Sequence, residues 1–338
     1  MSRPAASVGI IANPASGKDI RRLVAHATTV DTQGKISIVR RILIGLGALG
    51  ISKALIMPDT HRLGEQAQEG LAHTRYPLPE MELLDMPVTD RAEDSERAAS
   101  LLRQSHVGCI IVLGGDGTVR AVSKGAGEVP ILAVSTGTNN VLPSCAEGTI
   151  AGLAAGAVAK GLVSPEAAGV RHKWLEVLVN GSPQDRALVD VAALSGRFVG
   201  SRAVWDMGDL RQVAVTRADP ATIGISAIVG VVRPVAVEEP VGVVLTLSPS
   251  GGRRFLVAVG PGLIAEVGIE ALRVIRLGEE VEVSSSRPLI LALDGEREIV
   301  LQEGDTASFV LRPDGPWIID PRRVMEKMAA ARLFELSS

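Results

Sequence analysis

Between Ser7 and about Val134, short runs of β-branched residues alternate with longer amphipathic stretches, and this alternation constrains the fold more than any other feature. Buried strands of a parallel sheet look continuously apolar when helices cover both faces. The expected strands are 8–12, 54–57, 81–84, 107–113 and 131–134. The expected helices are 19–28, 35–49, 61–73, 90–105, 118–126 and 148–161. The pattern predicts an α/β N-terminal domain with a Rossmann-like parallel sheet.

After Val163 the sequence changes to short strand-like runs separated by Gly, Pro and Asp, which is typical of a mostly β domain. The expected strands are 174–179, 187–194, 211–215, 241–247, 255–259, 281–284, 289–293, 298–301 and 307–311, followed by a helix over 321–336. A length of 338 residues suits two domains. We place the first at 1–163 and a β-rich C-terminal domain at 164–319.

Charge and composition argue against several classes of protein. The formal net charge is −3, from 35 Lys and Arg against 38 Asp and Glu, and there is no basic run, so a nucleic-acid binder is not expected. The longest uncharged apolar stretches, 148–159 and 221–232, are shorter than the roughly 20 residues of a membrane span. The N-terminus has no evident signal peptide, so the default expectation is a cytoplasmic protein.

The strongest local motif is Gly114-Gly115-Asp116-Gly117-Thr118, which directly follows the buried run at 107–113 and precedes a helix. Such a turn directs backbone N–H groups and a helix N-terminus at one point, an arrangement that binds phosphate. The glycines allow close approach to the anion. The Asp116 carboxylate can orient Mg²⁺ or accept a proton from a hydroxyl. The alternative interpretation is a glycine-rich turn with a capping aspartate.

Two further turns follow apolar runs. Asn13-Pro14-Ala15-Ser16-Gly17-Lys18 offers short polar side chains and, at Gly17, the backbone freedom that phosphate approach requires. An ordinary Asn-Pro turn with a solvated Lys18 is the alternative. The third turn, 135–140, offers hydroxyls and amides. All three turns would lie at the carboxyl ends of parallel strands, so we expect them to share one crevice.

Three other features need separate interpretation. The run 45–50 matches the G-x-G-x-x-G dinucleotide fingerprint, but a strand-like run follows it, so we interpret its glycines as packing contacts at a helix end. Asp294-Gly295 is typical of a hairpin turn, and Glu296 after it could also be a carboxylate that faces the crevice. Asp190 lies in an apolar strand, where an acid either faces water at an edge or binds something specific.

The GGDGT motif after a buried strand, together with the upstream Asn-Pro-x-Ser-Gly loop, resembles the superfamily of NAD kinases and diacylglycerol- and sphingosine-type lipid kinases. Within it the chain is most similar to the ATP-NAD kinase-like proteins of the acetoin catabolism protein X family. The resemblance implies an α/β nucleotide-binding domain followed by a β-sandwich domain, with the segment 320–338 packing back on the first domain. It also implies ATP and Mg²⁺ as cofactors and a homo-oligomer.

By matching motif, the resemblance gives Asp116 a catalytic role on the acceptor hydroxyl or the metal nucleotide. Asp294 and Glu296 resemble the Asp-Gly-Glu of bacterial lipid kinases, whose Glu is a proposed base. Glu296 is therefore a second candidate catalytic residue, and Asp294 is a candidate for acceptor binding together with Asp190, which aligns with the acid of NAD kinases that grips a ribose. The expected nucleotide and phosphate contacts are Asn13, Ser16, Gly17, Gly114, Gly115, Gly117, Thr118, Thr138, Asn139 and Asn140.

The sequence departs from NAD kinases at the acceptor site. Val189 stands where those enzymes carry an Asn before the acid, and 221–227 lacks the Tyr of their Thr-Gly-Ser-Thr-Ala-Tyr loop. We predict an ATP-dependent phosphotransferase that acts on a hydroxyl of NAD, as in NADP biosynthesis, or of a related small molecule. Two alternatives stay open: a nucleotide-binding regulatory protein without catalysis, and a lipid or diol kinase.

Overall fold

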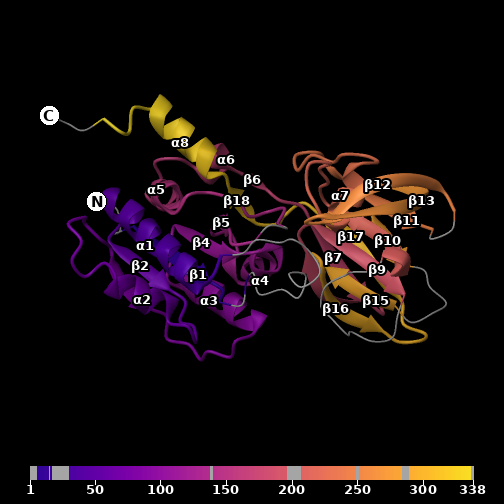
Figure 1. Cartoon of the computed structure of the whole chain (residues 1–338), viewed down its shortest axis with the longest axis horizontal. Helices are drawn as coiled ribbons and strands as arrows, with labels where there is room; N and C mark the ends of the chain where they lie inside the picture. Colours follow the sequence, from indigo (N-terminus) through magenta and orange to yellow (C-terminus); the bar gives the residue numbers. More distant parts are fainter. Residues whose placement is uncertain are drawn as a thin grey trace.

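The computed structural model describes residues 6–14, 16, 30–137, 140–195, 207–248, 251–283 and 289–335. They form an α/β part and a β-rich part that lie end to end along the long axis of the molecule (Figure 1). The last helix, yellow in Figure 1, lies against the α/β part. The helix expected at 19–28 lies outside the described residues.

The α/β part contains a mixed sheet of seven strands. These are β1 (Ser7–Ala12), β2 (Lys53–Ile56), β3 (Glu80–Leu83), β4 (Cys109–Gly114), β5 (Ile131–Ser135), β6 (Gly169–Arg171) and β18 (Trp317–Ile319). In the order β3-β2-β1-β4-β5-β18-β6, every neighbouring pair is parallel except β18 and β6. The first five strands are the apolar runs of the sequence, so the predicted fold class of this part is confirmed.

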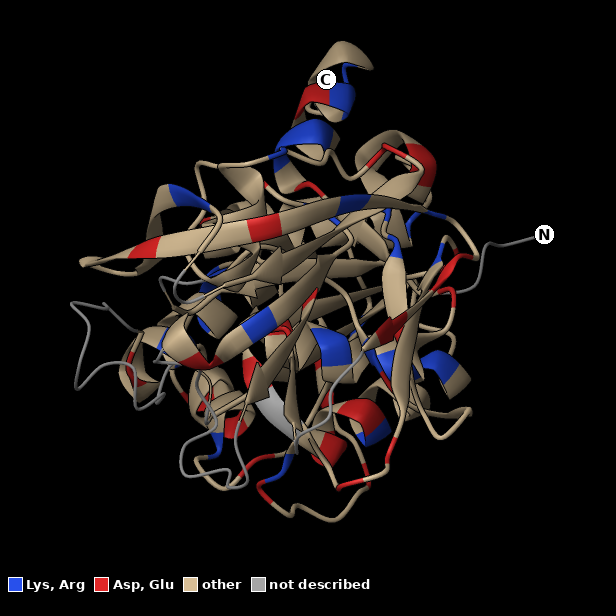
Figure 2. Cartoon of the chain, turned by 90° about the vertical axis from the view of Figure 1, so that its right-hand side faces the viewer, with Lys and Arg blue, Asp and Glu red and all other residues tan. Residues whose placement is uncertain are grey.

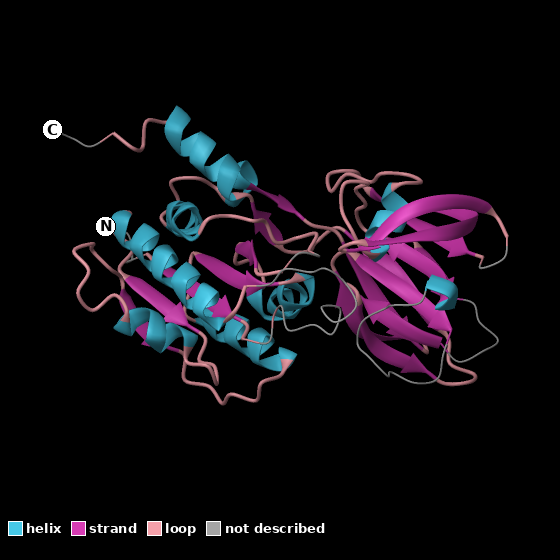
Figure 3. Ribbon diagram, viewed as in Figure 1, coloured by secondary structure: helices cyan, strands magenta, loops and turns pink. Residues whose placement is uncertain are grey.

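Helices cover both faces of this sheet (Figure 3). One face packs against α1 (Thr32–Ala48), α2 (Leu63–Glu69), α5 (Gly148–Ala159) and α8 (Pro321–Ala330), with α6 (Pro165–Ala168) beside α8. The other packs against α3 (Ala92–Gln104) and α4 (Asp116–Ala126). Capping explains where two of them begin. The Asp31 side chain accepts from Gly34 N at 2.7 Å, and Asp320 caps α8 just before Pro321.

The β-rich part is a sandwich of two antiparallel sheets, in the orders β12-β13-β11-β10-β9-β15-β16 and β14-β17-β7-β8. The strands are β7 (Trp174–Val179), β8 (Ser182–Ala187), β9 (Asp190–Ser195), β10 (Leu210–Val215), β11 (Val241–Leu247), β12 (Arg253–Gly260), β13 (Leu263–Arg276), β14 (Glu280–Val283), β15 (Leu289–Leu293), β16 (Glu296–Leu301) and β17 (Ala307–Arg312). One apolar core, which includes Leu175, Leu291 and Phe309, fills the space between the sheets. The helix α7 (Ile225–Gly230) covers the other face of the larger sheet, and a 3-10 turn, η2 (Met207–Asp209), precedes β10.

Several features of this part differ from the sequence expectation, including β8 and α7, which were not predicted. No strand was predicted at β13, which contains strong helix formers but is held extended by pairing with β11 on one side and β12 on the other. The strand expected at 187–194 is found from Asp190 onward, as β9, whereas Leu188 and Val189 separate it from β8, which ends at Ala187. β8 is a polar edge strand, and such an edge tolerates Pro183.

The chain crosses between the two parts twice. Because β6 and β18 both belong to the first sheet, the crossings lie after Arg171 and before Trp317. The chain thus leaves the first sheet several residues after the predicted domain boundary at Val163. The division into 1–163 and 164–319, with 320–338 packing back on the first domain, stays a prediction.

The glycines of the run 45–50 pack a helix end. Gly45 and Gly47 lie in the last turns of α1. A Cβ at Gly45 would lie 2.5 Å from the carbonyl oxygen of Thr149 in α5, and one at Gly47 would collide with the carbonyl oxygen of Pro77. The interpretation of these glycines as packing contacts is confirmed.

Gly152→Ala tests how tightly α1 and α5 pack. A Cβ at Gly152 would collide with the backbone carbonyl oxygen of Ile42, so we expect the substitution to lower the free energy of unfolding by about 1–3 kcal/mol. Gly156→Ala on the same helix is the matched control, because its Cβ would meet only side-chain carbons, and alanine favours a helix by about 1 kcal/mol. Urea unfolding measures both. Equal stability of the two variants would contradict the close contact.

Candidate functional site

Three loops meet at the carboxyl ends of β1, β4 and β5. The chain continues from β1 to β2 on one side and from β4 to β5 on the other, so the strand order changes direction between β1 and β4. In open α/β sheets ligands bind at such a point, because the diverging connections leave a crevice there. The described residues of the three turns singled out in the sequence all lie at this edge of the sheet.

Side chains join these loops directly. Asn13 Nδ2 donates to Thr118 Oγ1 at 3.1 Å, and the hydroxyl oxygens of Ser16 and Thr136 are 3.0 Å apart. Within the third loop, Asn140 Nδ2 donates to a serine hydroxyl at 2.7 Å. The structure therefore brings the described residues of the predicted phosphate set together. Three further members of that set lie outside the described residues: Gly17, Thr138 and Asn139.

Glycines leave the backbone N–H groups at the start of α4 accessible. Gly115 is the N-cap and Asp116 the first helical residue, so the first N–H groups of the helix have no partner within it. A Cβ at Gly114 would lie 2.6 Å from the Thr118 side chain, and one at Gly115 would lie 2.8 Å from Asn140 Oδ1. With glycine at both positions, an anion can approach these donors closely, and the helix dipole favours it there.

Lys35 is a residue of this site that sequence reasoning missed. It lies on the buried face of α1, and its Nζ donates to the backbone carbonyl oxygens of Asn13, Pro14 and Ser16 at 2.9, 3.1 and 2.7 Å. The ammonium group thus holds the carbonyls of the loop after β1 toward α1 and fixes the shape of the loop. A lysine on the otherwise apolar face of α1 was the available signal.

Asp116 is a buried carboxyl at the first turn of α4. Its oxygens accept hydrogen bonds from the backbone N–H groups of Val141 and Leu142 at 2.9 and 2.8 Å. Burial raises the pKa of Asp116 to about 7, against the lowering effect of those two amides; Asp294 nearby raises it further, and Arg217 lowers it. A carboxyl with a pKa near neutrality can take up and release a proton at physiological pH.

Asp294 occupies the tip of the hairpin between β15 and β16, with φ at +49°, so the hairpin-turn interpretation is confirmed. Its carboxylate accepts hydrogen bonds from the N–H groups of Leu188, Val189 and Asp190 at 3.1, 2.7 and 3.2 Å. The side chain is fully buried, and this burial raises its pKa. These contacts make Asp294 a group that positions the hairpin. Its role in acceptor binding stays a prediction.

Glu296 brings a second carboxylate from the β-rich part to the start of α4. Its Oε1 lies 3.0 Å from the position that a Cβ on Gly117 would take. Asp116 and Glu296, the two predicted catalytic residues, thus reach the same helix end from different parts of the molecule.

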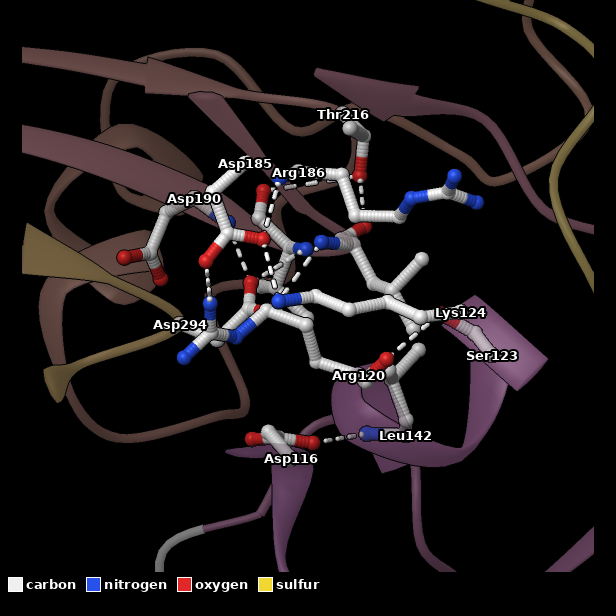
Figure 4. A network of polar contacts seen from close by, with 12 residues as sticks. Asp116, Arg120, Ser123, Lys124, Leu142, Asp185, Arg186, Asp190, Thr216 and Asp294 are labelled. Carbon is white, nitrogen blue, oxygen red and sulfur yellow. Dashed lines mark hydrogen bonds and ion pairs between the residues drawn. The ribbon is translucent and has the colours of Figure 1, made fainter. Parts of the chain in front are cut away.

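An ion network joins α4 to the β-rich part (Figure 4). Arg120 Nη1 lies 2.9 Å from Asp185 Oδ2, and its Nε lies 3.6 Å from Asp294 Oδ2. One turn later, Lys124 Nζ lies 2.5 Å from Asp185 Oδ1. Because Asp116, Arg120 and Lys124 follow one another on successive turns, the network fixes the hairpin relative to Asp116. The polar edge strand β8 gave no sequence signal that would single out Asp185.

Asp190 is buried at the start of β9. Its backbone carbonyl accepts a hydrogen bond from the N–H of Asp294 at 2.9 Å, so it lies beside the hairpin tip. In Figure 4 its carboxylate lies apart from the dashed contacts of the ion network. The role of Asp190 in acceptor binding stays a prediction.

Charged residues of both signs are interspersed along the ribbon in Figure 2. Within the described ranges, no helix is long and apolar enough to cross a membrane. The described residues also contain no group of three or more His, Cys, Asp or Glu side chains placed to bind a metal ion.

Comparison with known proteins relates both halves of the chain to families. Residues 8–162 match the family model of the ATP-NAD kinase N-terminal domain, and residues 173–314 match that of the acetoin catabolism protein X C-terminal domain. The acetoin catabolism protein X of Cupriavidus necator is 40% identical over 313 residues, which cover 90% of this chain and 87% of that protein. These matches confirm the resemblance inferred from the motifs.

Solved structures with similar folds are more distant. A diacylglycerol kinase from Bacillus anthracis aligns over 95% of this chain and 99% of its own, with 13% identity and a TM-score of 0.43. An NAD kinase from Archaeoglobus fulgidus in complex with ATP aligns over 83% of this chain and 98% of its own, with 18% identity and a TM-score of 0.39. At these TM-scores the assignment to a family rests on the sequence matches.

Asp185→Asn tests the ion network. The side chains of Arg120 and Asp185 are 6% and 16% exposed, and the substitution leaves Arg120 without its closest carboxylate. We expect the free energy of unfolding to fall by about 1–3 kcal/mol. Glu266→Gln is the control, because its pair with Arg254 is exposed to water and contributes about 0–1 kcal/mol. Denaturant unfolding compares them, and equal losses would contradict a structural role for the network.

The raised pKa of Asp116 predicts how stability depends on pH. The carboxyl has an ordinary pKa of 3.8 and a pKa of about 7 in the folded protein, so its protonated form favours folding and its ionised form opposes it. This contribution is complete below about pH 4 and is lost as the pH rises to about 7. Asp116→Asn cannot ionise. The stability of the wild type relative to this variant should therefore fall between about pH 4 and 7, and a constant difference across that range would contradict the raised pKa.

Proposed function

Because this chain belongs to the acetoin catabolism protein X family, and its N-terminal half has the ATP-NAD kinase fold, we propose that it is an ATP-dependent phosphotransferase. It would transfer the γ-phosphate of ATP to a hydroxyl of NAD or a related small molecule. The observation that carries this proposal is the meeting of three linked loops at the N-terminus of α4, beside a buried carboxyl with a pKa of about 7.

The phosphates of ATP would lie over the start of α4. The residues present suit such a group, because glycine at 114 and 115 leaves the backbone donors accessible and Lys35 fixes the neighbouring loop. We assign phosphate contacts to Asn13, Ser16, Gly17, Gly114, Gly115, Gly117, Thr118, Thr138, Asn139 and Asn140. Mg²⁺ bound to the phosphates would neutralise their charge; it commonly takes one or two carboxylates besides the substrate phosphates. Asp116 and Glu296 present carboxylates at this helix end.

In the proposed step, the oxygen of an acceptor hydroxyl attacks the γ-phosphorus of ATP. The new oxygen–phosphorus bond forms as the bond to the bridging oxygen of ADP breaks, and ADP leaves with that electron pair. The hydroxyl proton passes to the Asp116 carboxylate, which must be ionised to accept it. Glu296 is the second candidate base, because it approaches the same helix end from the β-rich part.

The acceptor would be held by the β-rich part near Asp190. Two observations favour a small acceptor over a full dinucleotide. Val189, which stands where NAD kinases carry an Asn, is buried in the core that packs against α3 and α4. The hydroxyl of Ser226, within the counterpart of the dinucleotide loop, is buried in α7.

Product formation with Mg²⁺-ATP tests the proposal. We would follow ³¹P NMR and mass spectra with NAD and with a panel of polyols and diols, adding acetoin because the relative from Cupriavidus necator is named for its breakdown. The rate should rise with pH through about 7, as Asp116 ionises. Asp116→Asn should lower turnover by about 10²–10⁴-fold and leave the circular dichroism spectrum unchanged.

The outcomes separate the candidate functions. A phosphorylated product formed by the wild type and not by Asp116→Asn supports the phosphotransferase. Stoichiometric binding of ATP without transfer to any acceptor would instead favour a nucleotide-binding regulatory protein, and full activity of Asp116→Asn would exclude Asp116 from the chemistry. A homo-oligomeric, cytoplasmic protein with a part in NADP biosynthesis stays a prediction from the family resemblance.

A further inference from the structure

Arg217 projects from a backbone segment that is fixed on both sides. It follows β10 directly. The residue before it, Thr216, donates its hydroxyl to Leu188 O at 2.6 Å and its N–H to Val189 O at 2.9 Å. The residue after it, Ala218, exchanges two backbone hydrogen bonds with Val235. Arg217 therefore starts from a rigid base, next to the Leu188–Val189 amides that hold Asp294.

The Arg217 guanidinium differs from the other cations around the crevice. The ammonium of Lys35 is bonded to three carbonyls, and Arg120 and Lys124 are paired with carboxylates. Arg217 is only half-buried, and among the described residues it makes no hydrogen bond or ion pair. A guanidinium held partly out of water without a partner is a donor available to a ligand, and its planar set of N–H groups suits phosphate oxygens.

The charges around Arg217 define the side on which an anion would bind. Arg217 interacts electrostatically with Asp116, lowering the pKa of that carboxyl. Arg217 also interacts with His172 and Lys173, where the chain crosses between the two parts; it contributes to lowering the pKa of both groups, after burial as the main cause. Lys173 is itself engaged, because its Nζ donates to the carbonyls of Ala236, Glu239 and Val241. Of these three groups, Arg217 is the one that interacts with Asp116 at the start of α4.

We propose that Arg217 is a phosphate-binding residue contributed by the β-rich part, and that its guanidinium binds the terminal phosphate of the nucleotide above Asp116. This inference rests on the proposed function and extends it. The N–H groups of α4 and the loops after β1 and β5 approach that phosphate from the α/β part only. A cation from the opposite wall would complete its surroundings and stabilise the charge that the transferring group carries.

Affinities for Mg²⁺-ATP and Mg²⁺-ADP, measured separately by calorimetry, test the proposal. Because ADP lacks the terminal phosphate, Arg217→Ala should weaken ATP binding by about tenfold or more and change ADP binding by less than about twofold. Arg217→Lys keeps the charge and should recover part of the loss. The matched control is Arg211→Ala, at the far end of β10, whose side chain bonds, among the described residues, to the backbone carbonyls of Gly208 and Leu210.

Each result has a definite meaning. Unchanged ATP binding by Arg217→Ala overturns the assignment, as does an equal loss for ATP and ADP. An effect only on the affinity of a phosphorylated acceptor also overturns it and places the anion on the acceptor. The binding measurement does not require turnover, so a wild type that discriminates ATP from ADP through Arg217 without phosphorylating any acceptor keeps this inference while the proposed function fails. A wild type that binds neither nucleotide overturns both.

The pH profile of turnover provides a second readout that a merely structural role would not move. The groups that act on Asp116 are the amides of Val141 and Leu142, the Asp294 carboxylate paired with Arg120, and Arg217. The Glu296 carboxylate also lies at this helix end, beside Gly117. Removal of the Arg217 charge raises the pKa of Asp116 further. The rising limb of the profile should therefore shift to higher pH in Arg217→Ala and stay in place in Arg211→Ala. A shift to lower pH, or no shift, contradicts the proximity of Arg217 to Asp116.

Discussion

The contact of Arg120 with Asp185 and Asp294 determines how the two parts of the molecule are placed relative to each other. Arg120 lies one turn after Asp116 on α4, and both of its carboxylate partners belong to the β-rich part. An ion pair shielded from water tolerates little displacement, because a separated partner is left as an uncompensated charge. The helix that presents N–H groups to an anion therefore also fixes the hairpin that carries Glu296. The crevice depends on both parts of the chain.

This arrangement brings two buried carboxyls close together. Burial disfavours the ionised form of both Asp116 and Asp294, and their mutual repulsion raises the pKa of Asp116 further. Hydrogen bonds from backbone N–H groups offset part of the cost of burying these carboxylates. Asp116 accepts from two N–H groups of the loop after β5, and Asp294 accepts from three N–H groups where β8 ends and β9 begins. Asp294 also has Arg120. The better-compensated carboxyl is thus the positioning group, and the less compensated one is left with a pKa suited to proton transfer.

Much of the fold could be predicted because buried strands leave continuous apolar runs, and the loops at their carboxyl ends could be placed together from topology alone. The residues that were missed depend on contacts distant in sequence. Lys35 follows the expected helical pattern, but nothing local indicates that it binds carbonyls in the loop after β1. Asp185 lies on β8, a strand whose polar sequence is typical of a loop. The hairpin turn at Asp294 was predictable, whereas its hydrogen bonds join residues more than a hundred positions apart.

Under the proposed function, the two parts have separable tasks. The loops of the α/β part offer backbone N–H groups, hydroxyls and amides, which suit phosphates and carry no information about an acceptor. Acceptor choice then depends on the short segments of the β-rich part that reach the crevice, near Asp190, Arg217 and Glu296. In one of these segments, Val189 stands where NAD kinases carry a polar Asn, and it lies in the apolar core against α3 and α4. A change of acceptor can therefore leave the phosphate site intact, which is why the fold alone does not name the substrate.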